Sequence, residues 1–200
     1  MRCIEHTSDS TDRRRPEMNE RTYTVGPLLL AISAILWVAA APAFGQSNAL
    51  TVPQSIRVEH AAIIERLTKE AARADATGVV AQKALVFIKD HFAREEEFVF
   101  PPLGLLDEIA EGQLPDDATI KIAIEMAERT KKSRAGFHED HVTITSLMNE
   151  LRESATKLRE TDLVAFASSV AAHSLNEVEV VEPTTVMIGE YLRTKRHRTR

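Results

Sequence analysis

From Val52 onward, the pattern of apolar and polar positions predicts helices and gives little sign of strands. Ile56, Ile63 and Leu67 are spaced seven and four residues apart, which places them on one face of a helix. Ser55 stands just before this run, where a side-chain hydroxyl can cap the first turn. The first folded element is therefore expected to be an amphipathic helix that begins near residue 55.

Glycine and proline residues divide the rest of the chain into further helical segments. The expected helices run from Val79 to Phe98, ending before Pro101 and Pro102; from about Asp117 to about Lys157; from Thr161 to Pro183; and from Thr184 to about Arg193. Gly78 is expected to separate the first two helices, and Gly136 to kink the long third one. Four long amphipathic helices with short connections predict an all-α fold, an antiparallel four-helix bundle with a short C-terminal helix.

The first 45 residues differ in character from the rest of the chain. A polar segment with a run of arginines is followed by an uncharged apolar stretch over residues 25–41 and then by small residues up to Gly45. This order is typical of a secretory signal peptide, so we expect a targeting segment over residues 1–45 and an exported, periplasmic or secreted domain over residues 46–200, with no stable membrane insertion after cleavage. The alternative is a membrane anchor through residues 25–41, although a span usually takes about 20 apolar residues.

Composition narrows the classes of function. Hydrophobic residues make up 44% and charged residues 28% of the chain, a balance typical of a globular protein rather than a disordered one. The formal net charge of -5 argues against nucleic acid as a partner. Cys3 is the only cysteine, so any metal site in the folded part must use nitrogen and oxygen ligands.

An internal repeat divides the predicted domain into two halves. The first half carries His60, His91, Glu95 and Pro101, and the second half carries His141, His173, Glu177 and Pro183, in the same order and at nearly the same spacing. The two histidines of each half are 31 and 32 residues apart, and each glutamate follows its histidine by four residues. The repeat predicts one helical hairpin used twice and packed about a pseudo-twofold axis.

The spacing within each half suits a metal site in the core of a bundle. Residues i and i+4 of an α-helix lie on one face, about 6 Å apart along the axis, so a histidine and a glutamate placed in this way can point at one spot. The candidate ligands are His60, His91, Glu95, His138, His141, His173 and Glu177; His138 is included because it lies three residues before His141. Mixed imidazole and carboxylate ligands suit iron, manganese or zinc, and two bridging carboxylates favour two ions.

These residues resemble the hemerythrin-like family, also called the HHE cation-binding domain. The resemblance covers residues 52–193 and rests on His60, His91-Phe-Ala-Arg-Glu95, the run from Glu95 to Pro101, His141, and His173-Ser-Leu-Asn-Glu177. It implies a four-helix bundle with an oxo- or hydroxo-bridged di-iron centre held by these histidines and glutamates. It also implies a small diatomic ligand such as oxygen or nitric oxide.

The chain departs from the oxygen-carrying members of that family at three places. Those members place the histidine pair of the third helix at i and i+4, whereas His138 and His141 are three residues apart. Their last carboxylate follows its histidine by five residues, whereas Glu177 follows by four. Glu182 stands directly before Pro183, where an apolar or aromatic residue is expected.

Three functions are compatible with this pattern. The first is a non-haem di-iron protein that binds oxygen or nitric oxide, or that senses or holds iron outside the cytoplasm. The second is a di-iron redox enzyme, such as an oxidase, a peroxide-reducing protein or a nitrosative-damage repair protein. The third is a structural or sensory module whose metal only stabilises the bundle. A ferritin-like site is disfavoured because its Glu-x-x-His motif does not occur after residue 45. The oligomeric state is left open by the sequence.

Overall fold

The computed structural model describes residues 50–198, and within these residues the fold is all-helical without strands. Its elements are α1 (Gln54–Ala71), α2 (Ala76–Phe98), the 3-10 helix η1 (Pro101–Leu105), α3 (Leu106–Ala110), α4 (Asp117–Lys157), α5 (Thr161–Asn176), the π-helical segment η2 (Glu177–Val181) and α6 (Glu182–Arg198). The predicted all-α class is confirmed. The predicted targeting segment over residues 1–45 lies outside the described residues.

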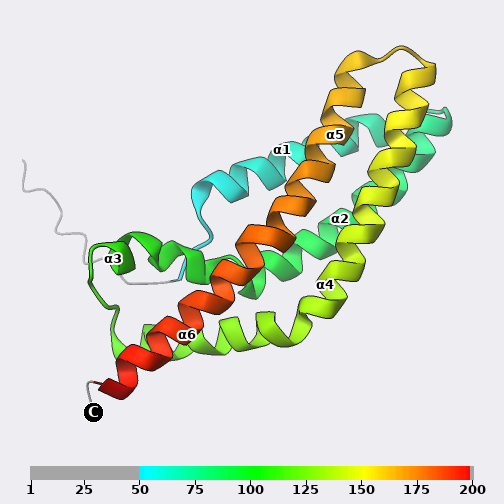
Figure 1. The fold of residues 1–200 in the computed structure, drawn as a ribbon. Coiled ribbons are helices and arrows are strands. Elements are labelled where there is room, and N and C mark those ends of the chain that lie inside the picture. The colour runs from blue at the N-terminus through cyan, green and yellow to red at the C-terminus, as the bar shows by residue number, and fades with distance from the viewer. Residues whose placement is uncertain (1–49, 199–200) are drawn as a thin grey trace, which may run out of the picture. The chain divides into compact units, whose positions relative to one another are not determined.

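The helices form two hairpins that pack on each other (Figure 1). α1 contacts α2, α4 contacts α5, and α2 joins the hairpins by its contact with α4. A buried apolar cluster fills the space between these four helices; it includes Leu67, Ile88, Ile144, Met148, Leu151 and Leu163. The amphipathic faces predicted from the sequence therefore meet in one core.

A second apolar cluster lies where η1, α6 and the first part of α4 meet. It includes Phe98, Phe100, Leu103, Ile120, Phe137, Ile188 and Leu192. Gly189 lets α6 approach α4 closely, because a Cβ atom at this position would overlap the Cβ atom of Ala127. α6 is consequently a main packing element, longer than the short C-terminal helix predicted over residues 184–193.

The predicted helix end at Pro183 is wrong. α5 continues through η2 into α6 as one rod, which Figure 1 shows running from orange to red. A proline inside an α-helix lacks the N–H that would bond four residues back, and its ring clashes with that carbonyl. The turn just before Pro183 is widened into a π turn, in which Glu182 N donates to Glu177 O, and the helix continues past the proline.

Two other sequence predictions at helix starts need correction. Ser55 lies inside α1, whose N-cap residue is Pro53 without a side-chain hydrogen bond. Gly78 lies in the first turn of α2 rather than in a break; its N–H donates to the capping carboxylate of Asp75 at 3.0 Å. A Cβ atom at residue 78 would overlap the carbonyl of Arg73, so close approach of the connecting loop requires glycine here.

The long third helix is confirmed. Asp116 caps α4 by accepting from Ala118 N and Thr119 N, both at 2.9 Å. The helix passes Gly136 without interruption, although Figure 1 shows that α4 bends along its length.

Within residues 50–198, no helix combines the length and the hydrophobicity that crossing a membrane requires.

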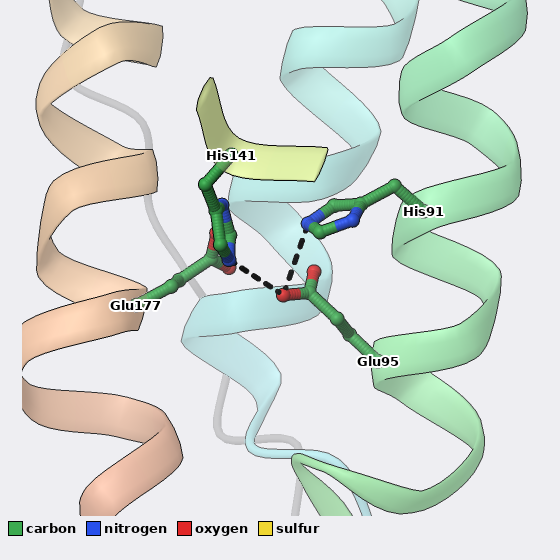
Figure 2. Close-up of side chains that lie close together, drawn as sticks. All are labelled: His91, Glu95, His141 and Glu177. Atoms are coloured by element: carbon green, nitrogen blue, oxygen red, sulfur yellow. Dashed lines mark ion pairs between the residues drawn. The ribbon is translucent and has the colours of Figure 1, made fainter. Parts of the chain in front are cut away.

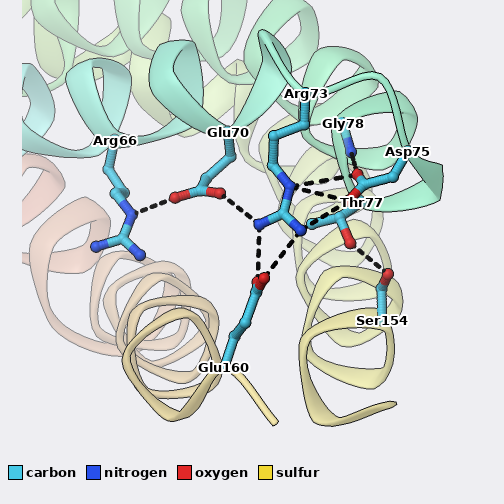
Figure 3. Close-up of polar contacts among 8 residues, drawn as sticks. All are labelled: Arg66, Glu70, Arg73, Asp75, Thr77, Gly78, Ser154 and Glu160. Atoms are coloured by element: carbon cyan, nitrogen blue, oxygen red, sulfur yellow. Dashed lines mark hydrogen bonds and ion pairs between the residues drawn. The ribbon is translucent and has the colours of Figure 1, made fainter. Parts of the chain in front are cut away.

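Arg73 ties the loop ends of the two hairpins together (Figure 3). Its guanidinium donates to both carboxylate oxygens of Glu160, at 2.8 and 2.9 Å, and to Asp75 at 2.7 Å. It also donates to Glu70, a buried carboxylate that Arg66 reaches from its other side at 2.8 Å. The guanidinium lowers the pKa of Asp75 and the pKa of Glu160, so both carboxylates stabilise the fold when they are ionised.

We predict that Arg73→Gln lowers the free energy of unfolding at pH 7 by about 1–2 kcal/mol, because it breaks charge-assisted hydrogen bonds and leaves Glu70 with one partner. The gap between wild type and variant should shrink as the pH falls below about 4, where Asp75 and Glu160 become protonated in the unfolded chain and then in the folded one. Chemical denaturation at a series of pH values measures both effects. Lys69→Gln, at an exposed position of α1, is the matched control and should change little. A gap that widens on acidification would contradict this account.

Candidate metal centre

Four helices each bring one histidine to a common point between the two apolar clusters. The structure gathers His60 from α1, His91 and Glu95 from α2, His141 from α4, His173 from α5 and Glu177 from the start of η2; all are buried. Figure 2 shows four of these side chains converging, with Glu95 directed toward both His91 and His141. The four helix faces on which the repeat places its histidines and glutamates therefore meet in the interior of the protein.

The gathered ligand atoms fall into two groups that share one carboxylate. His91, Glu95, His141 and Glu177 form one group, and His60, His173 and Glu177 form the other. Within each group, one ligand atom from each residue lies within 4.8 Å of the corresponding atoms of the others. A carboxylate common to two such groups is placed to bridge two cations.

The contacts inside the cluster are short but are not aligned as hydrogen bonds. His91 Nε2 lies 3.1 Å from Glu95 Oε1, and His173 Nε2 lies 2.9 Å from Glu177 Oε1. None of these four atoms has a hydrogen-bond partner, although all are buried. Two atoms about 2.1 Å from one ion, at right angles about it, are about 3 Å apart, so this spacing fits ligands that point at a shared ion.

Three of the four histidines are held from behind by carboxylates. Nδ1 of His60 lies 2.8 Å from Glu96, Nδ1 of His173 lies 3.1 Å from Glu59, and Nδ1 of His91 lies 3.4 Å from Asp140. A carboxylate accepts a hydrogen bond from the Nδ1–H group of the ring. The other ring nitrogen, Nε2, then keeps its lone pair, which is directed into the cluster. Such outer carboxylates orient histidine ligands and raise their basicity in metal sites.

Glu59 and Asp140 also reveal the pseudo-twofold relation. Glu59 precedes His60 and contacts the histidine of α5, whereas Asp140 precedes His141 and contacts the histidine of α2. Each hairpin therefore orients a ligand that belongs to the other hairpin.

Aromatic rings pack against the histidines of the cluster. Phe92 stacks on His60 with 3.5 Å between ring centroids, and Phe137 meets His91 edge-on at 5.6 Å. Phe100 meets His60 edge-on at 5.3 Å. This apolar wall strengthens electrostatic interactions inside the cluster and makes buried charge without a counter-ion costly.

Charge in the cluster is only partly balanced by its own side chains. Burial raises the pKa of Glu95 well above its ordinary value, and the nearby charge of Glu177 raises it further. Burial acts in the same direction on Glu177, but contacts with His173 and His60 outweigh it and lower the pKa of Glu177. Burial lowers the pKa of His91, which favours the neutral imidazole that a metal requires. A cation would neutralise the charge of the two carboxylates and so lower the free-energy cost of ionising Glu95 in the interior.

The structure does not bring His138 to this cluster. His138 is exposed on α4, and it lines a pocket of about 300 Å³ between α4 and α5. Val142, Leu175 and Val178 make much of the pocket wall apolar, and the pocket reaches His141 of the cluster. His138 lies three residues before His141 and on its solvent side. The spacing in the sequence allows either side, and the packing of α4 selects this one.

Four acidic residues of the site were not identified as such from the sequence: Glu59, Glu96, Asp140 and Glu182. The sequence held one indication of them, because three of the four stand next to a ligand candidate along the chain. Carboxylates in such positions are usually solvated, and tertiary contacts between different helices give them their roles.

No protein-family model, curated protein or solved structure matches this chain. What is shown is therefore structural: an all-helical protein with buried groups of histidine and glutamate side chains that could hold metal ions.

We predict that Glu95→Gln stabilises the metal-free protein and destabilises the metal-loaded one relative to wild type. Without a cation, the substitution removes a buried carboxyl group whose ionisation is opposed by burial and by the charge of Glu177, and it should raise the free energy of unfolding by about 1 kcal/mol. With ferrous iron present, the variant should lose the gain in stability that metal gives to wild type. Denaturation in the presence of a chelator and then of added metal measures this reversal. Glu65→Gln, at an exposed position of α1, should show neither effect. A variant less stable than wild type in both conditions would refute the prediction.

Proposed function

We propose that this chain is a non-haem di-iron protein of the hemerythrin-like type, in which α1, α2, α4 and α5 form an antiparallel four-helix bundle around the metal. The observation that carries the proposal is the pair of buried ligand groups sharing Glu177. Two adjacent groups with one common carboxylate fit two ions better than one. Both groups contain buried nitrogen and oxygen atoms that have no hydrogen-bond partner, so each ion would find ligands there.

Iron is the metal that this ligand set favours. The described residues offer imidazole and carboxylate groups and no thiolate, a mixture that suits iron or manganese, with zinc as a further option. His60, His91, His141 and His173 would hold the ions, Glu95 would neutralise the ion at His91 and His141, and Glu177 would be shared by both positions. Iron held by these residues would supply the chemistry for binding a small ligand such as oxygen or nitric oxide.

The protein's own part in this function is to orient the ligands and to limit access. The outer carboxylates hold the imidazole rings in place, and aromatic rings pack against them. The apolar pocket between α4 and α5 reaches His141 and is large enough for a small uncharged molecule. We further propose that residues 1–45 direct export, so that the protein binds its ligand in the periplasm or outside the cell.

We predict that the full chain binds two ferrous ions under anaerobic conditions and that Glu177→Ala loses both, because Glu177 belongs to both groups. His60→Ala should lose one ion, since His60 belongs to a single group. Metal analysis after desalting measures the stoichiometry. His138→Ala is the matched control, a histidine of the same region outside both groups, and should retain two ions. Unchanged metal content in Glu177→Ala, or purified protein with one zinc and no iron, would overturn the di-iron proposal.

Exposure of the ferrous protein to air separates binding from catalysis. A charge-transfer band that appears with oxygen and disappears on deoxygenation supports reversible binding. Irreversible oxidation accompanied by turnover of peroxide would favour the redox enzyme instead.

A further inference from the structure

The two halves of the site differ at one pair of corresponding positions. In the first half Phe100 stands directly before Pro101, is buried, and meets the ring of His60 edge-on. In the second half Glu182 stands directly before Pro183, and its side chain is only 2% exposed. The fold thus places a carboxylate beside His141 where it places a phenyl ring beside His60.

The oxygens of Glu182 have separate surroundings. Oε2 lies 3.5 Å from Nε of Arg134, which reaches it from the surface. Oε1 lies 3.3 Å from His141 Nε2 and has no hydrogen-bond partner among the described residues. His141 Nε2 is itself without a hydrogen-bond partner and also faces Glu95, at 3.7 Å. Oε1 therefore has the same character as the oxygens of Glu95 and Glu177: it is buried, unpaired and close to a ligand nitrogen.

The π segment is what brings Glu182 to this place. In a regular α-helix, residues five apart are separated by about 140° around the axis, so Glu177 and Glu182 would point to different faces. A π turn bonds residue i to residue i+5 and brings these two positions to the same side of the helix. Both carboxylates consequently face the cluster from one helix.

The two halves also differ at a second pair of corresponding positions. Glu96 supports His60 from behind, but the residue in the corresponding place of the second half is Val178. Nδ1 of His141 accordingly has no hydrogen-bond partner, and Glu177 Oε2 lies 3.9 Å from it. Glu182 lies at the other ring nitrogen, Nε2, which also faces Glu95.

We infer that Glu182 is a further carboxylate ligand of the ion held by His91 and His141, so that the two metal positions are unequal. This inference rests on the proposed di-iron function. The group at His91 and His141 contains Glu95 and Glu177, and Glu182 lies 3.3 Å from Nε2 of His141, whereas the group at His60 and His173 contains Glu177 alone. The extra negative charge holds the first ion more tightly than the second.

The test compares the full chain with Glu182→Gln, which removes the charge and keeps the shape. Wild type loaded anaerobically with ferrous iron-57 should give two Mössbauer doublets of equal area, because the two ions differ in ligands. In Glu182→Gln, one of the two ions should bind at least about 10-fold more weakly in a chelator competition, and one doublet should shift or disappear. Glu179→Gln, at an exposed position of the same π segment, should match wild type.

Two results would overturn the inference. One is a Glu182→Gln variant that holds both ions with wild-type affinity and spectrum. The other is equal weakening of both ions, which would mean that Glu182 acts by charge at a distance. Circular dichroism checks folding, and if Glu182→Gln does not fold, Glu182→Asp decides, because it keeps the charge and withdraws the carboxylate from one ion only. Wild type that binds fewer than two ions would instead refute the di-iron proposal itself.

Discussion

Two carboxylates buried without hydrogen bonds in the centre of the protein are the constraint on which the rest of the structure depends. Glu95 and Glu177 lie between four imidazoles, behind a wall of aromatic rings, and their oxygens have no aligned donor among the described residues. Such burial is costly unless opposite charge is present, and imidazoles that must remain neutral to bind metal do not supply it. The cations proposed for this site would supply that opposite charge.

The double hairpin explains how one fold presents two ligand groups. Each hairpin places a histidine and a glutamate on one helix and a second histidine on its neighbour, and carboxylates cross between hairpins to fix the rings. Because these outer contacts join different hairpins, orienting the ligands and packing the hairpins are a single event. Arg73 adds a similar cross-link at the loop end of the molecule, away from the site.

The two halves of the site depart from the twofold pattern, and the departure changes which side chains face the cluster. The π turn before Pro183 keeps α5 and α6 continuous and turns Glu182 inward, while Phe100 keeps the corresponding place in the first half apolar. π turns lie often at functional sites, where the inserted residue redirects a side chain. Here the redirected side chain is a third buried carboxylate beside the cluster.

The sequence by itself determined the helices and most of the side chains that gather in the buried cluster. Apolar periodicity is a local property, so it located α1, α2 and α4, and a histidine and a glutamate four residues apart share a helix face wherever the helix lies. The course of the chain at Pro183, the exclusion of His138 and the inward turn of Glu182 were decided by tertiary structure alone. A proline can end a helix or widen it, and a histidine three residues from a ligand can face the core or the solvent. Only the packing of α6 and α5 against α4 selects between these outcomes.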